Sequence, residues 1–129
     1  MARREYELGK GELEVLRALW EQGPGSVRDV LNYLHQRGRT VAYTTVQTVL
    51  SRLEQKGVVE SDRSELAFVY RARVSRERFS QKRLRSLLDQ LYDGAAGQLA
   101  LQLVRTKKLT SDEVEELRRL IDQLDAGRE

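Results

Sequence analysis

Residues 42–57, AYTTVQTVLSRLEQKG, combine aliphatic side chains at helical spacing with a high content of threonine. Threonine is a mediocre helix former, so several threonines on one helix indicate a functional role for that helix. Lys56 and Gly57 form a typical helix end, whereas the start is open, because Ala42 is a poor N-terminal cap and Thr40 is the alternative. The side chains predicted to face inward are Val46, Val49, Leu50 and Leu53.

The outward face of this helix is polar and carries no carboxylate in its first half. Short hydroxyls let a helix approach the floor of a DNA groove, glutamine pairs with adenine, and arginine pairs with guanine or phosphate. A face that is merely solvated usually mixes both charges, and it stays the alternative. Tyr43, at the helix start, is either a core residue or a phosphate ligand. The predicted DNA-reading residues are Thr44, Thr45, Gln47, Thr48 and Arg52, with Ser51 on the same face.

Two further amphipathic helices precede this one. Residues 11–22, GELEVLRALWEQ, place leucines and Trp20 on one face, and Gly23-Pro24-Gly25 ends the segment. Ser26 and Asp29 then form a capping-box pattern at the start of a second helix that stops at Gly38. The inward positions are predicted to be Leu13, Leu16, Leu19 and Trp20 in the first helix and Val27, Val30, Leu31 and Leu34 in the second.

A hairpin is predicted after the third helix, with strands at 58–61 and 66–73 joined by a polar turn at 62–65. Three helices followed by a hairpin indicate a winged helix-turn-helix, and another small α+β domain with the same element order is the alternative. Arg63 and Ser64 would let the wing touch sugar-phosphate or the minor groove. We expect residues 1–74 to form a winged-helix DNA-binding domain.

The remainder, residues 75–129, is predicted to be a helical dimerisation region. Gly94 and Gly97 separate or bend its helices, and Thr110 with Glu113 caps the last one, where Leu109 is placed to pack against Val114. Short helices with wide apolar faces need a partner, and a second copy is the simplest one. Phe79 and Leu87 belong to the apolar pattern, and the residues expected at the dimer interface are Leu84, Leu88, Leu91, Leu99, Leu103, Val114, Leu117, Ile121 and Leu124.

Composition narrows the function without deciding it. The 129 residues hold 23 basic and 20 acidic side chains, which gives a net charge of +3 and permits nucleic-acid binding. The one histidine, His35, is ordinarily a surface residue at a helix end, and no phosphate loop, serine elbow or metal-spaced cluster is present, so neither an enzyme nor a cofactor or metal is expected. With no cysteine, signal peptide or membrane-length apolar run, the cytoplasm is the expected location.

Three blocks of the chain resemble the penicillinase-repressor family, which includes copper-responsive members. They are LGKGELEVLRALWEQGPGSVRDV (8–30), TTVQTVLSRLEQKGVV (44–59) and LTSDEVEELRRLID (109–122). The resemblance implies a homodimeric transcriptional repressor whose winged helix binds double-stranded DNA at an inverted-repeat operator. A winged-helix protein-interaction module without sequence-specific DNA binding is the alternative. By position, the family's contacts fall on Thr44, Thr45, Thr48 and Arg52, with Tyr43 and Gln47 beside them.

Two departures from the family pattern concern the signal that lifts repression. Copper-responsive members carry paired cysteines near the C-terminus, and the absence of cysteine here excludes a thiolate copper switch. In antibiotic-responsive members a regulatory protease cuts an Asn-Phe step, to which Gln102-Leu103 corresponds in this chain. A protease partner is therefore an open expectation, and the operator sequence and regulated genes are not encoded in these patterns.

Overall fold

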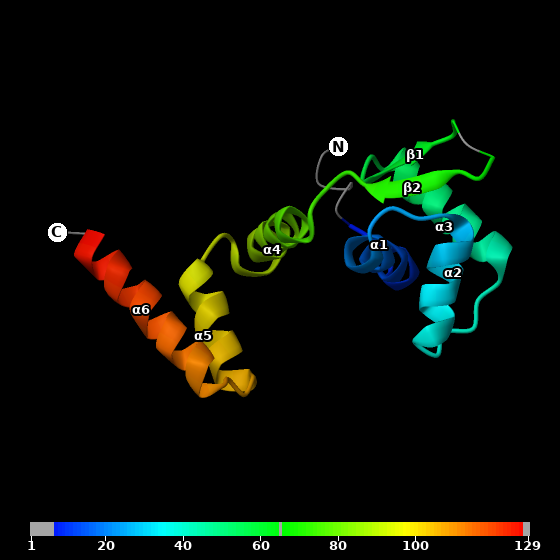
Figure 1. The fold of residues 1–129 in the computed structure, drawn as a ribbon. Coiled ribbons are helices and arrows are strands. Elements are labelled where there is room, and N and C mark those ends of the chain that lie inside the picture. The colour runs from blue at the N-terminus through cyan, green and yellow to red at the C-terminus, as the bar shows by residue number, and fades with distance from the viewer. Residues whose placement is uncertain (1–6, 65, 128–129) are drawn as a thin grey trace. The chain divides into compact units, whose positions relative to one another are not determined.

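The computed structural model describes residues 7–64 and 66–127 and contains six helices and one two-stranded antiparallel sheet within them (Figure 1). Residues 1–6, Glu65 and residues 128–129 fall within predicted domains or the predicted turn but lie outside the described part. The chain divides into two compact units, Met1–Ser86 and Leu87–Glu129. The elements are α1 (Lys10–Gln22), α2 (Val27–Gln36), α3 (Tyr43–Gln55), β1 (Val59–Asp62), β2 (Val69–Ala72), α4 (Arg76–Tyr92), α5 (Ala96–Thr106) and α6 (Ser111–Gly127).

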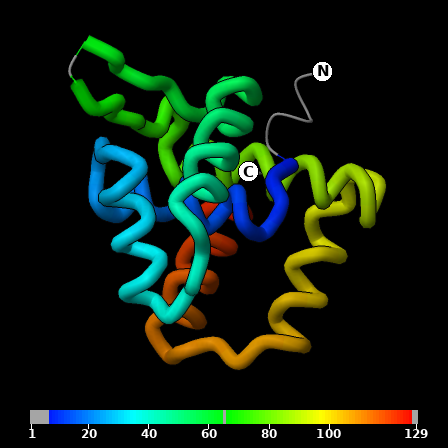
Figure 2. Tube along the Cα trace, turned by 90° about the vertical axis from the view of Figure 1, so that its right-hand side faces the viewer, coloured from blue at the N-terminus to red at the C-terminus, as the bar shows by residue number. Residues whose placement is uncertain are grey.

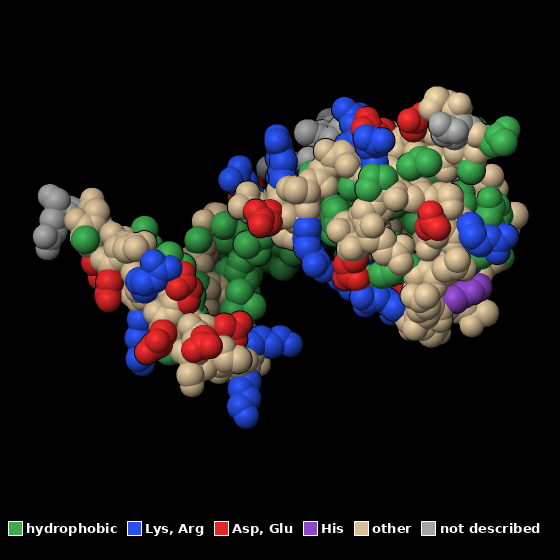
Figure 3. Space-filling view, in the orientation of Figure 1, with side chains coloured by type: hydrophobic (Ala, Val, Ile, Leu, Met, Phe, Trp, Pro, Cys, Tyr) green, Lys and Arg blue, Asp and Glu red, His purple; other side chains and the backbone are tan. Residues whose placement is uncertain are grey.

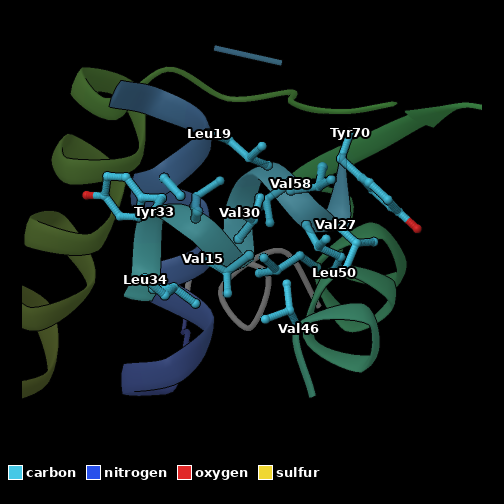
Figure 4. Packing of buried hydrophobic residues seen from close by; sticks show 14 of the residues in the cluster. Val15, Leu19, Val27, Val30, Tyr33, Leu34, Val46, Leu50, Val58 and Tyr70 are labelled. Atoms are coloured by element: carbon cyan, nitrogen blue, oxygen red, sulfur yellow. The ribbon is translucent and has the colours of Figure 1, made fainter. Parts of the chain in front are cut away.

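The first unit has one hydrophobic core, to which α1, α2, α3 and the hairpin all contribute. Figure 4 shows side chains of these elements meeting between the helices, among them Val15 of α1, Val30 of α2 and Leu50 of α3. Leu16, Leu50 and Leu53 are completely buried. The predicted fold class, a mainly α chain with a winged helix-turn-helix, is therefore confirmed, because the inward-facing residues of α1, α2 and α3 pack together as their spacing requires.

Local sequence signals set most of the helix ends. Ser26 Oγ accepts a hydrogen bond from the Asp29 amide at 3.1 Å, and Asp29 Oδ2 accepts one from the Ser26 amide at 2.9 Å, so the predicted capping box forms. The alternative of Thr40 as the cap of α3 is wrong. Ala42 is the N-cap, because its carbonyl accepts the first helical hydrogen bonds, and no side chain caps this helix.

The end of α3 is tied to α1 by a charged contact. Lys56 Nζ donates to a carboxylate oxygen of Glu12 at 2.9 Å, and the Gly9 amide donates to the same carboxylate at 3.0 Å. Partial burial raises the pKa of Glu12, but the hydrogen bond from Gly9 and the Lys56 ammonium outweigh it and leave the pKa below its usual value. Glu12 is therefore ionised in the folded state at neutral pH.

The wing differs from its prediction in length. Pairing runs from Val59 opposite Ala72 to Asp62 opposite Val69, so the predicted start of the second strand at Leu66 is wrong. Residues 63–64 and 66–68 lie outside the paired strands, and the side chains of Leu66 and Phe68 remain exposed rather than packing on a sheet face. An unpredicted bridge adds to the sheet, since the Gly25 and Tyr70 amides and carbonyls bond to each other at 2.9 and 2.7 Å.

The first unit also includes the start of α4. The Trp20 indole Nε1 donates to the Val74 carbonyl oxygen at 2.9 Å, and the Trp20 ring centroid lies 5.4 Å from that of Phe79. Phe79 is buried in the winged-helix core, so it does not belong with the C-terminal helices, where its periodicity placed it. The compact units divide after Ser86, whereas the predicted domains divide between residues 74 and 75.

The second unit contains the end of α4 together with α5 and α6. Asp93 and Gly94, with φ of 49° and 83°, reverse the chain after α4, whereas Gly97 lies inside α5. The Thr110–Glu113 capping box before α6 forms as predicted. None of the described residues from 87 to 127 is fully buried, and green patches mark the exposed apolar side chains of this unit in Figure 3. Its helices therefore keep wide apolar surfaces.

Candidate nucleic-acid interface

The polar face of α3 is the first component of the candidate site. Val46, Leu50 and Leu53 turn into the core, and this rotation leaves the opposite side of the helix in solvent. Figure 2 shows α3 along the front of the first unit. All of the predicted DNA-reading residues on this helix are exposed, namely Thr44, Thr45, Gln47, Thr48 and Arg52, together with Ser51.

The threonine hydroxyls on this face differ in their hydrogen bonding and in their position. Thr48 Oγ1 donates to the Thr44 carbonyl at 2.9 Å, so its proton is used within the helix while its lone pairs and methyl group remain available. Thr45 borders a crevice of about 80 Å³ beside Val41 and Val49, toward α1. The structure therefore gives Thr48 an acceptor role and sets Thr45 at the edge of the face.

The carboxylate of α3 is engaged away from its polar face. Glu54 is the one carboxylate of α3, and it is bound on the wing side of the helix. Its carboxylate accepts from Ser61 Oγ at 2.5 Å and from Arg63 Nη2 at 3.3 Å. The first turns of α3 thus face solvent with no negative charge of their own, and the first-turn amides have no side-chain cap.

Tyr43 and Arg28 form a pair at the start of α3. Tyr43 is 41% exposed, so the alternative that it is a core residue is wrong. The Arg28 guanidinium lies 5.2 Å from the centre of the Tyr43 ring and has no ion pair within residues 7–64 and 66–127. Arg28 is not among the residues predicted from the sequence, although a basic residue in the first turn of α2 was a usable signal.

The wing residues are held more tightly than the residues on α3. Arg63 contacts Glu54, donates through Nε to Ser61 Oγ at 3.2 Å, and lies 4.7 Å from the centre of the Phe68 ring. The Ser64 hydroxyl and amide both donate to Asp62 Oδ1, at 2.7 and 2.9 Å, and these bonds lower the pKa of Asp62. Arg63 is thus positioned by the protein, while the Ser64 hydroxyl is already engaged.

A crevice of about 280 Å³ separates α3 from the wing. It is contiguous with the polar face, because Tyr43 and Gln47 of α3 form one of its walls. The loop of the hairpin forms the facing wall. The residues that line it are Ser26, Val27, Tyr43, Gln47, Leu66, Ala67, Phe68 and Tyr70.

Other kinds of site find no support in the described part of the chain. Residues 7–64 and 66–127 hold no group of three metal-ligating side chains. His35 is exposed, and its Nε2 lies 3.2 Å from the Val41 carbonyl oxygen. No helix in the same residues is long and apolar enough to cross a membrane.

Comparison with known proteins accounts for this combination of a polar recognition helix and a helical C-terminal unit. A sequence model described as penicillinase repressor matches residues 8–123. The chain belongs to the penicillinase-repressor family. The match extends over most of both units, so the family assignment does not depend on the winged helix alone.

Three similar proteins support the assignment of this chain to the penicillinase-repressor family. The transcriptional regulator BlaI of Mycobacterium tuberculosis is 36% identical over 93% of this chain and 86% of its own length. The methicillin resistance regulatory protein MecI of Mammaliicoccus sciuri is 26% identical over 95% of this chain and 99% of its own. The penicillinase repressor of Staphylococcus aureus is 24% identical over 96% and 98%.

A solved complex of hsRosR-S4 shares the fold, with a TM-score of 0.53, 14% identity and full coverage of both chains. The likeness concerns the fold alone, whereas the family carries the function. The family member is accordingly a DNA-binding transcriptional repressor and not an enzyme, as the sequence predicted.

Proposed function

We propose that this family member represses transcription as a homodimer that binds a near-palindromic, inverted-repeat operator in double-stranded DNA. The observation that carries the proposal is the exposed face of α3, which bears hydroxyl, amide and guanidinium groups but no carboxylate before Glu54. Such a face suits the major groove, where base edges present donors, acceptors and the thymine methyl group. The single carboxylate of α3 is already paired with the wing.

Each residue of the face has a role that follows from its chemistry. Gln47 pairs with adenine, and Arg52 binds guanine or phosphate. Thr48 offers its methyl group and lone pairs to base edges, because its proton is bound to the Thr44 carbonyl. Thr44 and Thr45 also read base edges, and their short hydroxyls can donate to phosphates. Tyr43 at the helix start holds a phosphate, and Arg63 and Ser64 are the proposed wing contacts.

The second copy is proposed to cover the apolar surface of residues 87–127. Leu91, Ile121 and Leu124 are 70%, 55% and 65% exposed in the single chain. A crevice of about 400 Å³ between α5 and α6 adds to this surface, and its lining is Ala100, Leu103, Val104, Leu109, Glu113, Glu116 and Leu117. Monomeric proteins rarely expose contiguous apolar patches of this kind, and a two-fold dimer lets one face pack against itself.

Dimerisation fixes the form of the operator. Two copies of α3 related by a two-fold axis enter successive major grooves, so the half-sites lie about one helical turn, roughly 34–36 Å, apart. A protein bound there competes sterically with polymerase for the promoter. This activity places the protein in the cytoplasm, where the promoter is.

The inducing signal is proposed not to be copper bound by thiolates, because the chain has no cysteine. Cleavage by a regulatory protease would have to act at Gln102-Leu103, which lies inside α5, where the Gln102 carbonyl accepts a hydrogen bond from Thr106 Oγ1 at 2.7 Å. Proteases cut extended chains, so α5 would have to unwind before the cut.

The test is a titration of the full chain with the promoter fragment upstream of its own gene, repeated over a range of salt concentrations. A DNA reader loses affinity steeply as salt rises. Salt-independent or absent binding would favour the alternative of a protein-interaction module.

A matched pair of variants tests the recognition face itself. Thr48→Ala should lose about 1–3 kcal/mol of discrimination between operator variants. Thr106→Ala is the control, because Thr106 makes the same hydrogen bond to a carbonyl four residues earlier, but on α5. Equal discrimination by the two variants would remove Thr48 from the base contacts, and unchanged binding in Thr45→Ala and Arg52→Ala as well would remove α3 from the proposal.

A further inference from the structure

Two large apolar side chains lie exposed in the wing. Leu66 is 107% exposed, and Phe68 is 42% exposed, and both lie in the connection between β1 and β2. Figure 3 shows hydrophobic side chains gathered at this end of the hairpin. Neither residue contributes to the buried core of the first unit. An exposed leucine and an exposed phenylalanine that line the same crevice point to a contact outside the chain.

These side chains form one wall of the crevice between α3 and the wing, and Tyr43 forms part of the other. None of the described residues that line this crevice is acidic. An arginine stands beside each wall, because Arg28 lies against the Tyr43 ring and Arg63 lies against the Phe68 ring. The crevice is therefore apolar within, with the exposed Arg28 at one edge and Arg63, which is paired with Glu54, at the other.

The geometry of the DNA duplex indicates which part of it would lie in the crevice between α3 and the wing. The major and minor grooves of a duplex are separated by a single sugar-phosphate strand. If α3 occupies the major groove and the wing reaches the neighbouring minor groove, that strand must run between them. The strand presents apolar deoxyribose faces and anionic phosphates, which match the apolar walls and the two arginines.

We propose that the crevice between α3 and the wing seats one DNA strand, with Leu66 and Phe68 packed on deoxyribose and Arg28 and Arg63 bound to the flanking phosphates. The inference rests on the proposed operator binding and adds to it a strand-holding role for residues that do not read bases. Tyr43 supplies the facing apolar wall. The contact positions the recognition helix equally on every sequence.

Contacts to phosphate and contacts to deoxyribose differ in how the binding constant depends on salt concentration. A phosphate contact releases counterions, so losing one lowers the slope of log K against log salt by about 0.9. An apolar contact with deoxyribose releases none, so losing it weakens binding at every salt concentration without changing the slope. Affinity and slope measured together therefore separate the two roles.

The experiment measures operator binding by the full chain with Leu66→Ser, Phe68→Ser and Arg28→Ala over a range of salt concentrations. We expect each serine variant to bind about fivefold or more weakly with an unchanged slope, and Arg28→Ala to bind more weakly with a smaller slope. Hydroxyl-radical footprinting should show less protection of the deoxyriboses beside each half-site in the serine variants.

Control variants guard against loss of fold. Leu66→Met keeps the apolar contact and should bind like the wild type, and equal urea-unfolding midpoints of the serine variants and the wild type show that the fold is intact. Wild-type affinity and wild-type footprints in both serine variants would overturn the inference. If those variants bound DNA normally but failed to repress, the apolar side chains of the wing would belong to a contact with a protein partner instead. Failure of the wild type to bind any duplex would instead overturn the proposed function.

Discussion

Replacement of Ile121 by lysine is the most direct test of the proposed dimer. Ile121 is 55% exposed on α6, and it does not line the crevice between α5 and α6. Leu117 does line that crevice, so a charge there would also disturb packing within the chain. The lysine at position 121 therefore acts on the contact between copies while leaving the single chain intact.

The size of the effect follows from the surface still to be buried. Full burial of an isoleucine contributes about 1.5–3 kcal/mol, and with 55% of Ile121 exposed in the single chain about half of that, roughly 0.8–1.6 kcal/mol, remains for the dimer. Each of the two copies carries the change, so the dimer loses about 1.6–3.2 kcal/mol, or roughly 15- to 220-fold in the dissociation constant. Desolvation of the ammonium adds to this loss.

Sedimentation equilibrium of the full chain measures the constant directly. Gln123→Lys is the matched control, because it adds the same charge to an exposed position of α6 outside the apolar seam. Ile121→Lys should weaken dimerisation and operator binding together, while Gln123→Lys changes neither. A dissociation constant for Ile121→Lys within about threefold of the wild type would refute the assignment of this face to the dimer.

Three further substitutions give distinct outcomes. Trp20→Phe leaves the Val74 carbonyl without its donor and should cost about 1–3 kcal/mol in urea unfolding; an unchanged midpoint would contradict that bond's role in holding the start of α4. Glu12→Gln should destabilise the fold by about 1 kcal/mol at pH 7. Because the folded pKa of Glu12 is lowered, its contribution exists above the usual carboxyl pKa and is lost as pH falls through the folded value, so the two proteins should converge in acid. Arg52→Ala should weaken binding to all operator variants alike and reduce the salt slope by about 0.9 if the side chain holds phosphate, and a loss confined to one base position would assign it to guanine.

Features that depend on a few neighbouring residues could be predicted from the sequence. The Ser26–Asp29 and Thr110–Glu113 capping boxes formed because each connects residues three positions apart. The outward face of α3 was correct for a similar reason, since helical periodicity fixes which side chains share a face. The order of three helices and a hairpin then sufficed for the fold class.

The errors arose where distant segments meet. Tyr43 and Arg28 are 15 positions apart in the sequence and become neighbours only when α2 packs beside α3. Periodicity assigned Phe79 to the C-terminal helices, but Trp20 of α1 holds it in the winged-helix core. The length of the wing also depended on packing, because Leu66 and Phe68 continue the apolar pattern of the strand but find no sheet face to cover.

The sequence by itself determined the helices, their caps and the absence of carboxylates from the first turns of α3, because these are properties of residues within a turn or two of one another. Tertiary structure alone decided that the wing and α3 enclose an apolar crevice between two arginines. It also decided which apolar residues remain uncovered, because burial depends on what the rest of the chain places against a side chain, and no local pattern records that.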